Sequence, residues 1–229
     1  MSSTPAAVRQ EVHDPSELAA HGPVAHHFDD AVQQHDAAEL GMWAFLVTEV
    51  MFFGGLFLCY AIYRGSMPEQ FIAASQTLHV PLGTVNTAVL LTSSLTMALA
   101  VSAAQRQNRP KVTLFLVATL VLGAVFLGIK AYEYAEKFHH DHVPLLGWDF
   151  DPALPQGSQI FFVLYFIMTG LHAVHMVIGM GILLVLAYWS WWGRTPIRAT
   201  PIELTGLYWH FVDIVWIFLF PFLYLIKPA

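Results

Sequence analysis

Five long apolar stretches constrain this chain more than any other feature of its sequence. A helix of about 20 mostly apolar residues crosses the hydrocarbon core of a bilayer. We expect transmembrane helices at approximately 42–63, 82–104, 112–132, 159–189 and 207–226. Because these stretches fill most of the 229 residues, the sequence predicts an all-α, polytopic membrane bundle of five helices over residues 41–229, with no separate soluble domain.

The composition supports this class and excludes several others. Hydrophobic residues make up 56% of the chain and charged residues only 11%, whereas a soluble domain is about 25% charged. The same figures exclude a disordered chain. A single cysteine, Cys59, excludes a disulfide framework and any cysteine-rich metal site. A net charge of −6, with only ten Lys and Arg, argues against nucleic acid as a partner.

Residues 1–40 differ from the rest of the chain. They hold seven acidic residues, five histidines and one arginine, and no basic start is followed by an apolar core. This pattern is not that of a cleavable signal peptide. We expect a soluble acidic tail, with a short surface helix from about Asp29 to Leu40. The tail histidines are irregularly spaced, which favours solvated side chains over a metal site.

The distribution of Lys and Arg predicts the orientation. With a cytoplasmic N-terminus, six basic residues lie on the cytoplasmic side: Arg9, Arg106, Arg109, Lys111, Arg194 and Arg198. Four lie on the other side: Arg64, Lys130, Lys137 and Lys227. The positive-inside rule therefore predicts a cytoplasmic N-terminus and a periplasmic or external C-terminus. The long acidic segment from Glu133 to Asp151 suits the outer face.

Few ionisable groups lie within the predicted spans, where each costs about 2.5 to 3.5 kcal/mol on insertion scales. Glu49 lies in the first span, His172 and His175 in the fourth, and His210 and Asp213 in the fifth. Lys130 and Glu133, three residues apart, lie at the outer end of the third span. At 1.5 Å per residue, the carboxyls of Glu49 and Asp213 reach a similar depth and the histidines lie near it or above. We therefore predict a buried cluster of carboxyl and imidazole groups that is either structural or linked to protons. An isolated carboxyl in an apolar span favours its neutral form, so we expect Glu49 to be protonated.

The histidines in the predicted spans can be interpreted as structural residues or as ligands. Packing and helix–helix hydrogen bonding fit His172 and His175 better than haem ligation, because only His210 lies where it could oppose them across an iron. For His210 and Asp213, a structural contact between the two side chains fits best. The run His139-His140-Asp141-His142 fits a solvated loop better than a metal site. The sequence has no nucleophile elbow, phosphate-binding loop or complete metal ligand set, so no catalytic, cofactor-binding or metal site is predicted.

Five segments, one in each predicted helix and in the right order, resemble subunit III of the haem–copper oxidases. The resemblance runs from about residue 39 to the end and is closest to a short, five-helix bacterial form of the cytochrome c oxidase subunit III family. The segments are Gly41–Phe53 around Glu49, Val85-Asn86-Thr87, Lys130-Ala131-Tyr132-Glu133-Tyr134, Thr169–His175 and Tyr208–Trp216. Each segment alone is a weak match to the family, but the five together in this order form a specific pattern.

The resemblance implies an accessory role. Members of the family hold no redox centre and dock against subunit I, which carries the haems and copper, reduces oxygen to water and pumps protons. Subunit III is expected to stabilise subunit I, to support its proton uptake and to bind phospholipid. The intramembrane glutamate of the family matches Glu49, its histidine pair matches His172 and His175, and its C-terminal pair matches His210 and Asp213. Subunit or lipid contacts are expected at Asn86, Trp209, Trp216, Tyr132 and Glu133.

The chain also departs from the mitochondrial form of the family. That form has seven helices, and the two that are missing here form one side of its lipid cleft. A complete cleft therefore needs helices from another subunit, or the lipids are more exposed. Glu39 stands where that form has a basic residue, which puts a lipid-phosphate contact there in doubt.

The leading interpretation is an accessory subunit of a cytochrome c oxidase in the bacterial plasma membrane, with other oxidase subunits and a respiratory supercomplex as further partners. A quinol oxidase subunit III and a protein associated with nitric oxide reductase share the fold. A different class is a stand-alone proton-coupled transporter or a haem-binding membrane enzyme. Those proteins need broken helices or opposed axial ligands, and neither pattern is evident in the sequence.

Overall fold

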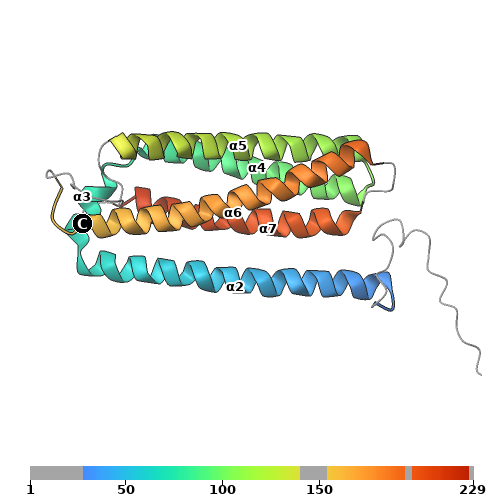
Figure 1. The fold of residues 1–229 in the computed structure, drawn as a ribbon, viewed down its shortest axis with the longest axis horizontal. Helices are drawn as coiled ribbons and strands as arrows, with labels where there is room; N and C mark the ends of the chain where they lie inside the picture. The colour runs from blue at the N-terminus through green and yellow to red at the C-terminus, as the bar shows by residue number, and fades with distance from the viewer. Residues whose placement is uncertain (1–27, 140–153, 194–197, 227–229) are drawn as a thin grey trace, which may run out of the picture.

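The computed structural model describes residues 28–139, 154–193 and 198–226, and these residues form six helices and no strand. Along the chain they are α2 (Ala31–Ser66), α3 (Pro68–Ser75), α4 (Val80–Gln105), α5 (Arg109–His139), α6 (Gln159–Trp192) and α7 (Ala199–Tyr224). All but α3 are long and apolar enough to cross a membrane, and these five lie side by side in one bundle (Figure 1). The predicted all-α, five-span architecture is confirmed.

Two of the helices begin well before the predicted spans. The surface helix expected at Asp29–Leu40 and the first span are one continuous helix, α2, because no proline separates them and the single Gly41 is tolerated within a helix. Its N-cap is Asp30, whose side chain accepts a hydrogen bond from the backbone N–H of Gln33. Helix α7 begins at Ala199, eight residues before the predicted start, since a proline such as Pro201 is tolerated within a first helical turn.

Helix α3 was not predicted, because eight residues are too short for a hydropathy signal. Pro68 occupies its first turn, where the missing N–H costs nothing. Its buried Phe71 packs edge-on against Tyr60 of α2 and Phe161 of α6, with ring centroids 5.3 and 5.5 Å away. The short helix thereby closes one end of the bundle between α2 and α6.

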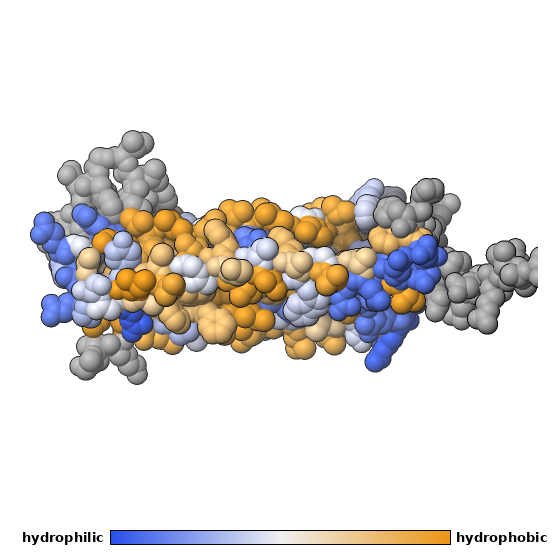
Figure 2. Space-filling model, turned by 90° about the horizontal axis from the view of Figure 1, so that it is seen from below, coloured by the Kyte–Doolittle hydropathy of each residue, from blue (hydrophilic) through white to orange (hydrophobic). Residues whose placement is uncertain are grey.

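Helices α4 to α7 form a tightly packed unit, and α2 lies along one side of it (Figure 1). Within its membrane-spanning part, α2 buries a narrow stripe of residues spaced seven apart, Leu46, Phe53 and Tyr60. The opposite face exposes large apolar side chains such as Met51. Figure 2 shows a broad hydrophobic belt around the middle of this face, with hydrophilic residues gathered at both ends. This pattern is typical of a surface that faces lipid or other membrane subunits.

The indole of Trp209 is the central packing element of the four-helix unit. It is fully buried between two glycines, Gly123 of α5 and Gly179 of α6. A Cβ added at Gly179 would lie 3.0 Å from the indole ring, and one added at Gly123 would lie 3.1 Å from it. The two glycines therefore let α5 and α6 approach α7 closely enough to enclose the indole.

We predict that Gly179→Leu disrupts the packing of α6 against α7. Overpacking a filled core costs about 1–3 kcal/mol, and sometimes more, so the variant chain should be lost from the purified complex at a lower temperature than wild type. The matched control is Gly181→Leu, because Gly181 has no atom within 4 Å of an added Cβ. Equal thermal stability of the two variants would contradict this account of the packing.

Candidate functional site

Glu49 and His175 meet inside the membrane-spanning region, at the boundary of α2 and α6. Glu49 Oε2 lies 3.6 Å from His175 Nε2, and the side chains are 18% and 15% exposed. Tyr208 of α7 donates its hydroxyl proton to the backbone carbonyl of His175 at 3.0 Å, and the same hydroxyl lies 3.3 Å from His175 Nδ1. The ring of Phe53 packs edge-on against the imidazole. This polar contact therefore links three helices.

His172 lies one turn away on the same helix, in a different environment. Its ring is 1% exposed and packs against Phe126 of α5 and Trp216 of α7, with centroid distances of 5.5 and 5.3 Å. Neither ring nitrogen has a hydrogen-bond partner within the described part of the chain. The structure thus places His175 with Glu49 and places His172 in the core between α5 and α7.

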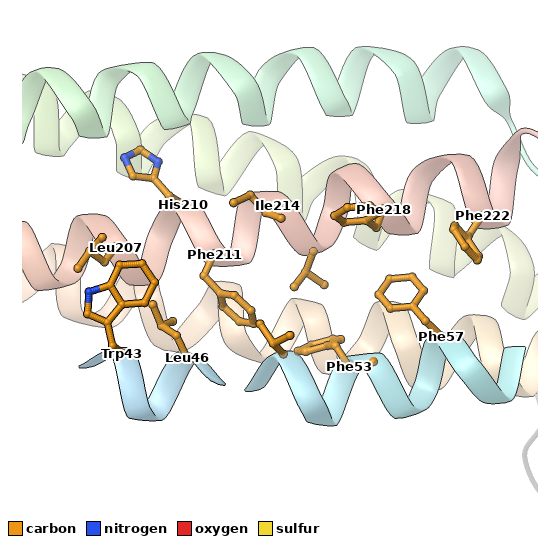
Figure 3. A pocket seen from close by; sticks show the side chains of 13 residues that line it. Trp43, Leu46, Phe53, Phe57, Leu207, His210, Phe211, Ile214, Phe218 and Phe222 are labelled. Carbon is orange, nitrogen blue, oxygen red and sulfur yellow. The ribbon is translucent and has the colours of Figure 1, made fainter. Parts of the chain in front are cut away.

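His210 and Asp213 of α7 both lie on the side of α4, but they do not bond to each other. His210 Nδ1 lies 2.7 Å from the hydroxyl of Ser94, and in Figure 3 its imidazole points away from α2. Asp213 is 2% exposed, and its two carboxyl oxygens have no hydrogen-bond partner among the described residues. The five residues predicted as one cluster are therefore distributed over three places in the bundle.

A buried network of charged and hydroxyl groups lies one to two helical turns from His172. The sequence does not predict it as a network. Lys130 donates hydrogen bonds to Glu133 Oε2 and to the Tyr224 hydroxyl, both at 2.7 Å, and to the Tyr165 hydroxyl at 3.3 Å. Tyr224 in turn donates to the Glu133 carboxylate at 2.9 Å. The ammonium also lies 4.8 Å from the ring of Trp216.

This network joins α5, α6 and α7 in a region shielded from bulk solvent, since Lys130 is 5% and Glu133 2% exposed. The i, i+3 spacing of the two charged residues was visible in the sequence. The two tyrosines come from positions 35 and 94 residues away from Lys130, and no sequence pattern points to them.

Four of the five residues expected at subunit or lipid contacts are buried within the chain. The indole N–H of Trp209 bonds to Ser93, that of Trp216 bonds to Thr87, and the amide of Asn86 donates to the Phe126 carbonyl. Glu133 belongs to the charged network. Only Tyr132, which is 65% exposed, is available to a lipid or a neighbouring subunit.

No group of three or more His, Cys, Asp or Glu side chains that could hold a metal occurs in the residues that the structure describes. Among the tail histidines, His35 lies on α2, where its ring contacts Glu39 and Thr200. The other four tail histidines and the side chains of the 139–142 run lie outside the described residues.

An apolar groove runs between α2 and α7 (Figure 3). It has a volume of about 610 Å³. Aromatic side chains from both helices line it, including Trp43, Phe57, Phe211 and Phe218. The one polar side chain in the lining is His210, and its imidazole points away from α2 in Figure 3.

The sequence profile of the family described as cytochrome c oxidase subunit III matches residues 16–227. The chain belongs to the cytochrome c oxidase subunit III family. It is subunit III of a haem–copper terminal oxidase and a multi-pass membrane protein, and members of this family carry no redox centre.

Subunit III sequences from several bacteria are similar to this chain over most of their length. Cytochrome c oxidase subunit 3 of Thermostichus vulcanus is 32% identical, over 86% of this chain and 92% of the relative. The protein of the same name from Corynebacterium diphtheriae is 34% identical, with the same coverage. Quinol oxidase subunit 3 of Bacillus spizizenii is 31% identical, over 81% of this chain and 85% of the relative.

We predict that Lys130→Met strongly destabilises the subunit III fold. Removing one partner of a buried ion pair leaves an uncompensated charge, which costs about 3–5 kcal/mol. The additional change Glu133→Gln should recover part of this loss in the double variant. The thermal midpoint at which the chain leaves the purified oxidase measures both effects.

The control is His79→Gln, which changes a more exposed polar contact of 3.0 Å between His79 and Glu136. Such a pair contributes about 1 kcal/mol or less. If Lys130→Met lowers the midpoint no more than His79→Gln, the network does not stabilise the fold as described.

Proposed function

We propose that this chain is the accessory subunit III of a proton-pumping oxidase that is fed by cytochrome c in aerobic respiration. In this role it stabilises subunit I, which holds the haems and copper, and supports proton uptake there. The observation that carries the proposal is the Glu49–His175 contact. It places a carboxyl and an imidazole 3.6 Å apart within the membrane-spanning region of an oxidase subunit.

The position of Glu49 favours an exchangeable proton over a purely structural role. Glu49 lies near the middle of α2, about 26 Å from either end of the helix at 1.5 Å per residue. A carboxyl at this depth is costly unless a polar group contacts it, and His175 is that group. Both side chains are partly exposed, unlike His172, so a neighbouring subunit can contact them.

A small difference in identity supports cytochrome c as the electron donor. Three relatives named cytochrome c oxidase subunit 3 are 32–34% identical to the chain, whereas relatives named quinol oxidase subunit 3 are 27–31% identical. A quinol oxidase is the second candidate. Membership in an oxidase subunit family favours a cytochrome c oxidase or a quinol oxidase over a stand-alone transporter or a haem-binding enzyme. Turnover of the purified complex with reduced cytochrome c and with a quinol distinguishes the two donors.

The apolar surfaces support two kinds of contact in the membrane. The exposed apolar side of α2 is suited to subunit I or another oxidase subunit. The groove between α2 and α7 has the shape and apolar lining to accept a phospholipid acyl chain. Tyr132 remains the exposed member of the predicted contact residues.

We propose that the start of α2 faces the cytoplasm. His35 near this start contacts Thr200 at the start of α7, and Gln105 at the end of α4 bonds to Glu203 of α7. These contacts put the three helix ends on one face of the membrane. The basic turn between α4 and α5, with Arg106, lies on the same face, which suits the cytoplasmic side.

Labelling with a membrane-impermeant maleimide tests this orientation in a Cys59→Ser background. Ser66→Cys, at the opposite end of α2, should be labelled in intact spheroplasts. Arg106→Cys should be labelled only in inside-out vesicles. The reverse pattern would show that the orientation is inverted.

We predict that Glu49→Ala reduces the number of turnovers that the oxidase completes before inactivation, while the initial oxygen-consumption rate keeps its order of magnitude. The reason is that subunit I carries the chemistry and Glu49 supports only its proton supply. The measurement is oxygen uptake over prolonged turnover by the purified complex.

Glu39→Ala is the matched control, because Glu39 is a more exposed carboxyl on the same helix. It should leave sustained turnover unchanged. Loss of assembly with Glu49→Ala, or sustained turnover equal to wild type in an assembled complex, would contradict the proton-linked role.

A further inference from the structure

Five buried polar atoms in the core of the α4–α7 unit have no hydrogen-bond partner within the described part of the chain. They are Asn86 Oδ1, both ring nitrogens of His172 and both carboxyl oxygens of Asp213. None of the three residues is more than 2% exposed. More than 90% of buried polar groups in proteins are paired, and each unpaired one costs about 1–3 kcal/mol. Five unpaired atoms in one core therefore point to a ligand that completes their hydrogen bonds.

These atoms lie within about one helical turn of each other along the bundle. The ring of Phe126 packs against both His172 and Trp216, and the Asn86 amide donates to the Phe126 carbonyl. Asn86 and His172 are thus at the level of Trp216. Asp213 precedes Trp216 by three residues on α7, about 4.5 Å along the helix axis.

Further polar groups continue the row in both directions. Towards the start of α7, Ser94 bonds to His210 and also interacts with the Asp213 carboxyl, although not in the geometry of a full hydrogen bond. Towards the end of α7, Lys130 lies against the Trp216 ring and bonds to Tyr224. The row from His210 to Tyr224 covers 14 residues of α7, about 21 Å.

The row begins at an opening on the surface. His210 lines a pocket of about 470 Å³ between α2, α4 and α7. Polar side chains also line this pocket: His35, Glu39, Gln105 and Glu203. Because these polar side chains lie near the ends of α2, α4 and α7, we expect the pocket to open to the aqueous phase rather than to lipid.

We propose that ordered water molecules bind in this core, bridge Asp213, His172 and Asn86, and connect the pocket at His210 with the Lys130–Glu133 network. The chemistry of the three side chains matches water. A neutral imidazole donates from one nitrogen and accepts at the other, and carboxyl and amide oxygens accept. A buried water makes two to four hydrogen bonds, and these groups supply that number of partners within one helical turn. Water has access through the polar pocket.

A density map of the intact oxidase, at a resolution that shows bound water elsewhere in the complex, tests the proposal. We expect peaks about 2.7–3.2 Å from the His172 nitrogens and from the Asp213 carboxyl. An internal control is the contact between Trp209 and Ser93, which is already satisfied by a direct bond of 3.1 Å and should show no peak. A map with well-defined side chains and no density between Asp213 and His172 would overturn the proposal.

The variant Asp213→Leu provides a second test, because leucine is similar in size and makes no hydrogen bond. Peaks next to residue 213 should disappear from its map, while water elsewhere in the oxidase stays in place. Persistence of the same peaks beside the leucine would also overturn the proposal. If this variant does not assemble, the wild-type map decides alone. Neither test depends on the role proposed for Glu49.

Discussion

A polar group inside a bilayer must find its partner within the protein, and this constraint determines the arrangement of the whole subunit. Described backbone in the membrane-spanning region is helical, so its N–H and C=O groups are satisfied locally. Polar side chains then turn inward and join neighbouring helices. Trp209 bonds to Ser93, Trp216 bonds to Thr87, and Lys130 bonds to Glu133 and Tyr224. The apolar side chains are left to form the belt that faces the membrane.

The same constraint explains why α2 differs from the other long helices. Helices α4 to α7 share a core of buried aromatic and polar contacts, whereas α2 is attached through one apolar stripe and a few polar contacts. These include the Glu49–His175 contact, the hydrogen bond from Tyr60 to the Phe222 carbonyl and the contact of His35 with Thr200. The rest of its surface is exposed and apolar. An element that is attached on one side and exposed on the other suits contact with further membrane subunits.

Hydropathy predicted the spans because the bilayer selects about 20 apolar residues per helix. It missed the parts of helices that lie outside the hydrocarbon core, such as the first turns of α7 from Ala199. Outside the core, polar helical residues have the same hydropathy as loop residues. The membrane-embedded ionisable residues were also predicted, but their grouping was not. Residues three apart on a helix point about 60° apart, which is enough to direct His175 towards α2 and His172 into the core. Contacts such as Lys130 with Tyr224 depend on how the helices pack, and a single sequence does not encode that directly.

In this account the chain supplies packing and polar contacts to an oxidase whose redox chemistry takes place in another subunit. The most direct test is the visible absorption spectrum of this chain after purification and separation from the other subunits. The account predicts that all haem absorption remains with the other subunits and that this chain shows no Soret band. A Soret band that stays with this chain through purification would contradict its accessory role.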